Sequence, residues 1–288
     1  MLSSGRRLHL YKRLKIENVK EKFKMAKISK IEAQKRKGRY NIYLDGKYAF
    51  PVAESVLIQF RLMKGTELDE KQIAAIATAD QQAKAYSRML DYLSYQMRTE
   101  SDIVKKLKEI DTPEEFIEPI LKKLRDQQLI DDHAYAASYV RTMINTDLKG
   151  PGVIRQHLRQ KGIGENDIDD ALTQFTPEVQ AELAKKLARK LFRRYRNQPE
   201  RRRQQKVQQG LMTKGFSSSV YEMIKDEVVP QPDLEQENDL LAKEAAKQWR
   251  RVRRYQGYER EQHFKQTMYR KGFDLDDVQS WLDAQDFQ

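Results

Sequence analysis

The 288-residue chain contains no cysteine. Disulfides, cysteine nucleophiles and thiolate zinc sites are therefore excluded, and the composition fits a reducing compartment such as the cytoplasm. No apolar run approaches the roughly 18 residues that a membrane-spanning helix needs. Only 39% of the residues are hydrophobic and the mean hydropathy is −0.85, so any core must be thin and spread along the chain. We expect a cytoplasmic protein with no membrane partner.

Residues that carry catalysis or bind metals are also scarce. The four histidines lie far apart, and none has a second histidine one helical turn away, as a paired-histidine zinc site requires. No G-x-x-x-x-G-K-[ST] phosphate-binding loop occurs. Acidic pairs such as Asp169 and Asp170 follow predicted helix starts, where they complement the helix dipole. We expect no cofactor, no metal and no enzymatic activity.

Residues 1–26 form a strongly basic leader, with eight basic side chains against two acidic ones. The leader lacks the continuous apolar stretch of a signal peptide. Segments of like charge are usually solvated, so we expect this leader to be disordered, with a basic nucleic-acid-binding arm as the alternative.

Strand-forming patterns follow at once, in the segment 27–80. Residues 40–44 are mostly aromatic and β-branched, and Asp45 and Gly46 come next. Asp-Gly between two such runs is typical of a tight hairpin turn in which both residues adopt positive φ. We predict a small N-terminal β-hairpin, followed by short helices after Pro51 and after Gly65.

From about residue 81 onward, a helical unit repeats four times. A Lys-Gly pair closes an amphipathic helix at Gly162, Gly215 and Gly272, and an earlier copy has Asp111 in the glycine place. Glycine suits the left-handed backbone that ends a helix. After each turn comes an apolar i, i+4 pair in a third helix, and before each pair of helices lies a longer one. The long helices are predicted at 81–98, 133–145, 178–196 and 235–254.

One unit of about 50 residues cannot bury a large core by itself, so tandem copies must stack. The predicted fold class is therefore mainly α: an elongated array of tandem three-helix, helix-turn-helix-like repeats after the N-terminal hairpin and helix segment. The predicted repeats are 81–130, 131–176, 177–230 and 231–288.

Positive charge is concentrated in the last two repeats. Residues 178–229 carry 13 basic and 6 acidic side chains, and leucines at i, i+4 and i+8 leave most cations of the long helix on its other faces. Such ridges bind phosphates through counterion release, although a basic surface can equally meet an acidic protein or merely keep the chain soluble. The residues predicted to bind nucleic acid or a nucleoprotein are Lys186, Arg189, Lys190, Arg193, Arg194, Arg196, Arg201, Arg202, Arg203, Lys243, Lys247, Arg250, Arg251 and Arg254.

Four aromatic residues lie near these cations in the sequence: Phe192, Tyr195, Tyr255 and Tyr258. Aromatic side chains beside cations can stack on exposed bases. At helical spacing they more often belong to the core, so we favour packing over stacking.

Six segments of the chain match a pattern found in one family: YNIYLDGKYAF at 40–50, KGTEL at 64–68, the helical stretch 90–107, LIDDHAYA at 129–136, KGPG at 149–152 and LRQKG at 158–162. Together they resemble the RecX family of bacterial regulatory proteins, which modulate the RecA recombinase. The resemblance covers residues 27–287, and the fourth repeat is similar to the longer members of the family.

The resemblance implies a non-enzymatic inhibitor of RecA that acts in homologous recombination, DNA repair and the SOS response. Family members lie along the groove of the RecA filament on single-stranded DNA and suppress its ATPase, its growth and strand exchange. The implied partners are the RecA filament and single-stranded DNA, with duplex DNA as a further one. We expect this chain to act as a monomer.

Two other functions are compatible with the sequence. A stand-alone DNA-binding protein would compete for single- or double-stranded DNA, because the three-helix units resemble helix-turn-helix domains. A recognition helix should begin with basic residues, however, and residues 166–170 and 274–277 are acidic. The other function is a helical scaffold for acidic proteins, with the hairpin as a docking edge.

Overall fold

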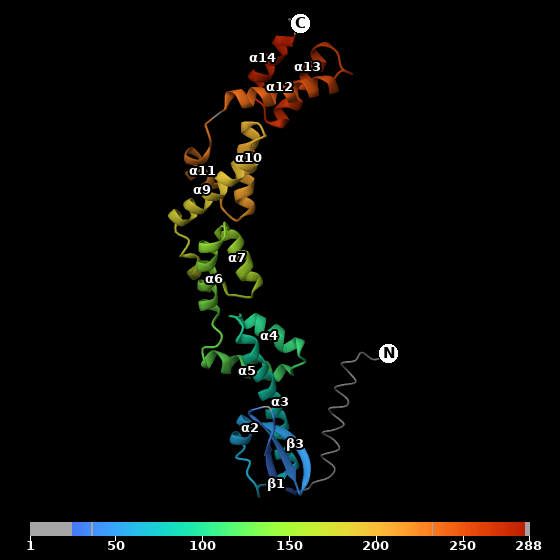
Figure 1. Cartoon of the computed structure of the whole chain (residues 1–288), viewed down its shortest axis with the longest axis vertical. Helices are drawn as coiled ribbons and strands as arrows, with labels where there is room; N and C mark the ends of the chain where they lie inside the picture. The colour runs from blue at the N-terminus through green and yellow to red at the C-terminus, as the bar shows by residue number, and fades with distance from the viewer. Residues whose placement is uncertain (1–24, 36, 232, 286–288) are drawn as a thin grey trace. The chain divides into compact units, whose positions relative to one another are not determined.

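A computed structural model describes residues 25–35, 37–231 and 233–285, which form two compact units divided between Asp131 and Asp132. The predicted leader lies outside the described residues, apart from its last two positions. Helices dominate both units, as predicted, and strands occur at the start of the first (Figure 1). No helix in these described ranges is long and apolar enough to cross a membrane.

The first unit begins with a four-stranded antiparallel sheet in the order β3-β2-β1-β4. The predicted hairpin is confirmed, because Asp45 and Gly46 at its turn have φ values of 47° and 81°. The last strand was not predicted, since its three residues are too few to show an alternating pattern. The strands are β1 (Met25–Ala33), β2 (Arg39–Leu44), β3 (Lys47–Ala53) and β4 (Glu67–Asp69).

Helices α2 (Glu54–Gln59) and α3 (Glu70–Leu93) pack on this sheet and complete its core. The prediction of separate helices on either side of residue 80 is wrong, because α3 runs through that position without a break. The 24 residues of α3 include no glycine or proline to interrupt it. Its first half covers the sheet, and its second half joins the first three-helix domain.

The buried Asp80 holds the sheet to the middle of α3. Its carboxylate accepts hydrogen bonds from Arg39 Nη1 at 2.6 Å and from the backbone N–H of Ala53 at 2.8 Å, so it grips β2 and β3 together. Lys84 Nζ, one turn further along α3, lies 2.8 Å from the other carboxylate oxygen.

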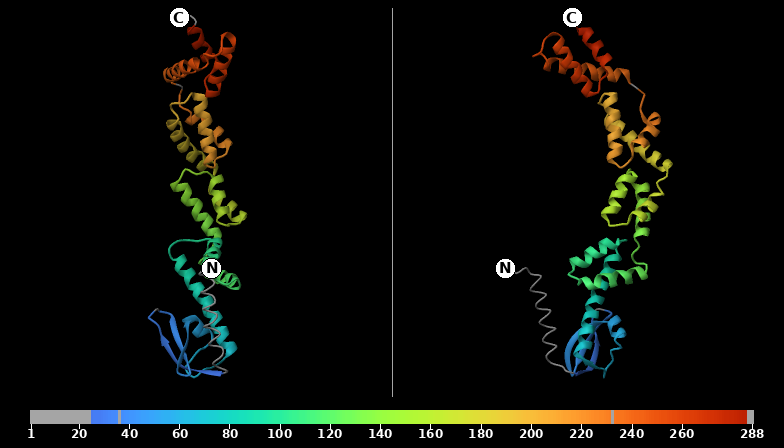
Figure 2. Two further views of the ribbon diagram at one scale, coloured as in Figure 1. Left: turned by 90° about the vertical axis from the view of Figure 1, so that its right-hand side faces the viewer. Right: turned by 180° about the vertical axis from the view of Figure 1, so that it is seen from behind.

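The remaining helices form tandem three-helix domains, as predicted, and in the second unit they cluster in threes (Figure 2). In the first unit, α3 is joined by α4 (Glu100–Glu109) and α5 (Glu114–Asp126). The second unit contains α6 (Asp132–Thr146), α7 (Pro151–Gln160) and α8 (Glu165–Leu172), then α9 (Pro177–Arg194), α10 (Glu200–Thr213) and α11 (Ser218–Val228), and finally α12 (Leu234–Arg251), α13 (Gly257–Lys271) and α14 (Leu275–Gln285).

The middle helix of every domain ends in the predicted left-handed turn. Gly162, Gly215 and Gly272 have φ of 80°, 89° and 98°, and Asp111 has 56°. In each case the N–H of the following residue bonds to a carbonyl five residues earlier, as from Phe216 to Leu211 at 3.1 Å. The turn thereby places an apolar residue in the core of three of the four domains: Ile163, Phe216 and Phe273.

The same turns also join domains within the second unit. Gly152 N–H donates to Gly215 O at 3.0 Å, so the end of α10 abuts the start of α7. A Cβ on Gly150 would lie 2.5 Å from the backbone of Gly215, which leaves no room for another residue type. A Cβ on Gly272 would likewise lie 2.7 Å from Cβ of Arg202, so the end of α13 abuts the start of α10. Each contact sets the negative end of one helix dipole against the positive end of another.

The two junctions differ in chemistry. The second and third domains share one continuous hydrophobic core, whereas the core of the fourth domain is separate. Contacts between the third and fourth domains are therefore largely polar.

We predict that Asp80→Asn loosens the sheet from α3. The substitution leaves the guanidinium of Arg39, with 15% of its side chain exposed, without its anionic partner. Losing one member of such a pair costs about 3 kcal/mol, so hydrogen–deuterium exchange of β2 and β3 should quicken by about 100-fold. Lys30→Gln, which removes an exposed pair with Glu32, should change exchange by less than about tenfold. Unchanged protection of β2 and β3 in Asp80→Asn would contradict this role.

Candidate nucleic-acid interface

One side of α9 carries a continuous row of cations, here called the α9 face. Its residues recur at i, i+3, i+4, i+7 and i+8 and are all exposed: Lys186, Arg189, Lys190, Arg193 and Arg194. The opposite side is buried and consists of Leu183, Ala184, Leu187, Ala188 and Phe192. Because burial of this apolar stripe fixes how the helix is rotated, the cations must point to solvent.

The α9 face is not neutralised within the described part of the chain. None of its five cations forms an ion pair with a described carboxylate, whereas the neighbouring Lys185 does. Lys185 Nζ lies 2.7 Å from Glu227 and 3.3 Å from Glu182, and the bond to Glu227 raises the pKa of the lysine above its usual value. The charge of the face is therefore available to an external polyanion.

A similar row, the α12 face, lies on the first helix of the fourth domain and just beyond its end. It comprises Lys243, Lys247, Arg250, Arg251 and Arg254, all exposed. Leu241, Ala245 and Gln248 are buried on the other side of the helix. The one ion pair to a described carboxylate, Lys243 with Asp239 at 3.9 Å, joins two side chains that are each more than 70% exposed, so it contributes little.

The predicted role of Arg203 is wrong. Its side chain is only 6% exposed, and its Nη2 lies 3.3 Å from Oε1 of Glu237 on α12. The other oxygen of Glu237 accepts the backbone N–H of Glu200 at 3.2 Å. Burial raises the pKa of Glu237 above its usual value, and the charge of Arg203 opposes that rise. Arg203 thus ties the third domain to the fourth and presents almost no charge at the surface.

Of the other predicted cations, Arg196, Arg201 and Arg202 are exposed. Arg201 donates to the hydroxyl of Tyr269 at 2.8 Å and lies over its ring, which makes a second polar tie between the two domains. Val207 and Leu211, at i+4 and i+8 from Arg203, are buried on the same stripe of α10. That spacing was the signal in the sequence that could have separated Arg203 from its neighbours.

The four aromatic residues behave mostly as packing residues. Phe192 is buried, and Tyr195 and Tyr255 are half-buried beneath the cations of Lys206 and Arg254. Tyr258, four residues after Arg254 in the sequence, is 76% exposed.

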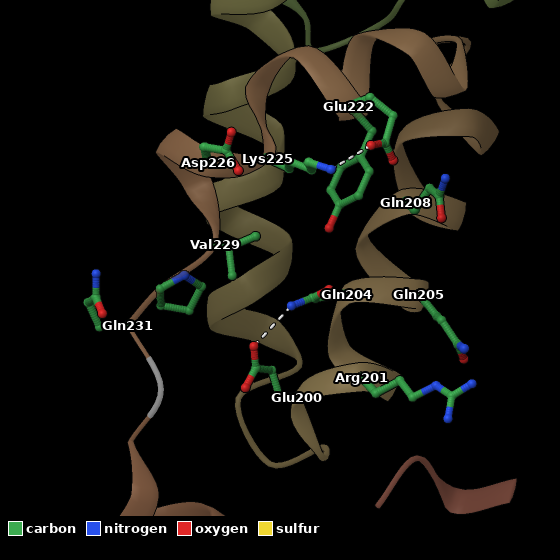
Figure 3. Close-up of a pocket in the computed structure, with 12 residues that line it drawn as sticks. Glu200, Arg201, Gln204, Gln205, Gln208, Glu222, Lys225, Asp226, Val229 and Gln231 are labelled. Carbon is green, nitrogen blue, oxygen red and sulfur yellow. Dashed lines mark hydrogen bonds and ion pairs between the residues drawn. The ribbon is translucent and has the colours of Figure 1, made fainter. Parts of the chain in front are cut away.

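A polar cavity of about 530 Å³ lies between α10 and α11 (Figure 3). Glutamines of α10 line one wall, and Lys225 pairs with Glu222 across the other at 2.8 Å. The lining holds three carboxylates, of Glu200, Glu222 and Asp226, against the cations Arg201 and Lys225. This balance of charge does not favour an anionic ligand.

A second cavity, of about 380 Å³, opens between α10, α12 and α13 and is strongly cationic. Its cations include three that are not among the predicted binding residues, Lys206, Arg270 and Lys271. No motif marks them, because they converge only when two domains pack together. Elsewhere, the described ranges contain no cluster of His, Asp and Glu that could hold a metal ion.

Models of four RecX segments match the chain. The "Regulatory protein RecX N-terminal domain" matches residues 26–69, and the "first three-helix domain" and "second three-helix domain" match 85–124 and 131–172. The "third three-helix domain" matches twice, at 178–220 and 235–282. The chain belongs to the RecX family. Its fourth domain is accordingly a second copy of the third RecX type, and both copies carry a basic face on their first helix.

Individual relatives agree with this family. Regulatory protein RecX of Limosilactobacillus reuteri (strain DSM 20016) is 97% identical over 264 residues, which are 92% of this chain and 100% of that one. Regulatory protein RecX of Levilactobacillus brevis is 50% identical over 258 residues, 90% of this chain and 97% of the relative.

Two solved structures are also similar. A crystal structure of regulatory protein RecX is 96% identical, with a TM-score of 0.67 over 70% of this chain and 100% of that one. RecX from Lactobacillus salivarius is 45% identical, with a TM-score of 0.50 over 52% of this chain and 97% of that one.

We predict opposite consequences for two arginine substitutions in the third RecX domain. Arg203→Gln leaves the half-buried Glu237 without a charged partner and should destabilise the fourth domain by about 2 kcal/mol. Unfolding can be followed through Trp249 and Trp281, which both lie in that domain. Arg193→Gln should change stability by less than about 0.5 kcal/mol but weaken binding to single-stranded DNA. If the two variants were equally stable and lost DNA binding equally, Arg203 would be one of the exposed binding residues and would not hold the two domains together.

Proposed function

We propose that this RecX-family protein inhibits the RecA recombinase by binding the RecA filament on single-stranded DNA. RecA as the partner follows from the family. The observation that carries the proposal is the pair of cationic faces on α9 and α12, which lack strong ion pairs within the described chain and belong to two domains of one RecX type. A filament that holds DNA offers a repeating polyanion to which both faces can bind.

Counterion release drives such binding, since each phosphate that meets a lysine or arginine frees condensed ions. Tandem domains add a second effect. Once one domain is bound, the next is held near a neighbouring subunit of the same filament, so its binding is effectively intramolecular. The assembled filament is thereby preferred over free RecA, and a chain lying across several subunits blocks growth, the ATPase and strand exchange.

A stand-alone DNA-binding protein that competes for the strand is the second candidate, because the same exposed cations would serve it. Readout of duplex DNA by the third helix of each domain is disfavoured. The first turn of α8 holds Glu165 and Asp167, and that of α14 holds Asp276 and Asp277. These carboxylates would repel the phosphates that flank a groove.

We expect the protein to inhibit the DNA-dependent ATPase of RecA at amounts far below those needed to coat the DNA. The readout is ATP hydrolysis on a long single strand while the protein is titrated upward from well below stoichiometric. Inhibition that begins only near full coverage of the strand would favour competition for DNA. If no amount of the protein inhibited the ATPase, a helical scaffold for acidic proteins would be the better-supported function.

Reversing Arg189, Arg193, Arg250 and Arg254 to glutamate should raise the half-inhibitory concentration at least about tenfold and flatten its salt dependence. A matched control reverses Arg88, Lys105, Lys108 and Lys122, four exposed cations of the first three-helix domain. The control changes net charge equally and should leave inhibition near the wild-type level. Equal effects of both variants would mean that net charge, and not the two faces, determines binding.

A further inference from the structure

The cavity between the third and fourth domains is lined by five cations and one carboxylate. Its charged lining comes from three helices: Arg202 and Lys206 of α10, Lys243 of α12, and Arg270 and Lys271 at the end of α13. Glu244 is the one carboxylate in the lining. Neutral donors from Asn197 and Gln198 complete the wall.

Little of this charge is compensated inside the cavity. Glu244 Oε1 lies 3.1 Å from Lys271 Nζ, so the one acid of the lining is already taken by one of the five cations. Arg202, Lys206 and Arg270 form no ion pair with any described carboxylate, and Lys243 has only the long, exposed contact to Asp239. Like charges held close together repel one another, and a bound anion removes that repulsion.

Backbone packing holds the cations in place. Gly272, with φ of 98°, presses against Arg202, where an added Cβ would lie 2.7 Å from Cβ of the arginine. This contact sets Arg270 and Lys271 beside the first turn of α10. The Arg203–Glu237 ion pair, from the next residue of α10, fixes α12 on the same helix. The convergence therefore follows from the domain junction and not from flexible surface side chains.

We propose that this cavity binds backbone phosphates of single-stranded DNA as the strand passes between the two basic faces. Guanidinium groups match phosphate oxygens in a bidentate geometry, and lysines add point charge. The cavity shares Lys243 with the α12 face, and Asn197 of its wall lies three residues beyond Arg194, the last residue of the α9 face. The cavity between α10 and α11, with more carboxylates than cations, makes no such match.

That the ligand is a DNA strand rests on the proposed function. That the cavity binds phosphate groups rests on the residues that line the cavity. The test therefore uses the full chain without recombinase. Binding of a fluorescently labelled oligothymidylate is followed by anisotropy over a salt series, for wild type and for the triple variant Arg202→Gln, Lys206→Gln, Arg270→Gln. These three substitutions leave the Lys271–Glu244 and Arg203–Glu237 ion pairs intact.

Each phosphate contact to a single strand contributes about 0.7 to the slope of log K against log salt. The triple variant should therefore lose about 2 from that slope and bind at least about tenfold more weakly at low salt. The matched control Lys105→Gln, Lys108→Gln, Lys122→Gln removes the same charge from the first unit and should keep the wild-type slope. If the triple variant folds poorly, Arg270→Gln alone should lower the slope by about 0.7.

An unchanged slope in a folded variant would overturn the proposal. The proposal would also be overturned if calorimetry showed that the wild-type chain binds inorganic pyrophosphate and the triple variant does not, while both have the same salt slope for DNA. The cavity would then be a site for a free phosphate compound. Loss of affinity for the RecA filament with an unchanged DNA slope would overturn it in favour of an acidic protein surface. Failure of the proposed function is a separate result, namely that the wild-type chain leaves the RecA ATPase unaffected.

Discussion

The close approach of backbone at the Lys-Gly turns is the constraint on which the second unit depends. Each turn ends the middle helix of its own domain. At Gly215 and Gly272 the turn also packs against the start of the middle helix of the preceding domain. A side chain at either position would meet atoms within 3 Å. The turns therefore set both the fold of each domain and the way in which successive domains join.

Packing within the domains and between them determines where the positive charge lies. Packing by the apolar stripe of α9 leaves one face of the helix to solvent, and that face carries arginine and lysine with no described carboxylate to pair with. At the junction of the third and fourth domains the contacts are polar, and cations from three helices meet around one cavity. This arrangement supports the proposal that the chain binds a polyanion through several modest sites.

The sequence was sufficient to predict what depends on local pattern. Asp45 and Gly46 predict the hairpin turn, and the spacing of the repeats places Asp111 where the other domains have a glycine. What it could not predict depends on contacts between elements. Helix α3 continues through residue 80 because two different layers pack along it, and Arg203 is buried because the partner domain supplies Glu237. The spacing of Arg203 from Val207 and Leu211 marks it as the inward-facing arginine of the three, but no sequence pattern shows that Glu237 of another domain is its partner.

Above all, we propose that the α9 and α12 faces lie against the DNA-bearing filament. Acetylation of individual lysines, quantified by mass spectrometry in the free protein and in its complex with the RecA filament on single-stranded DNA, tests it most directly. We expect Lys186, Lys190, Lys243 and Lys247 to react at least several-fold more slowly in the complex, and Lys105, Lys108 and Lys122 to react at unchanged rates. Equal rates for the first four lysines in both states, or protection confined to the first unit, would contradict the account.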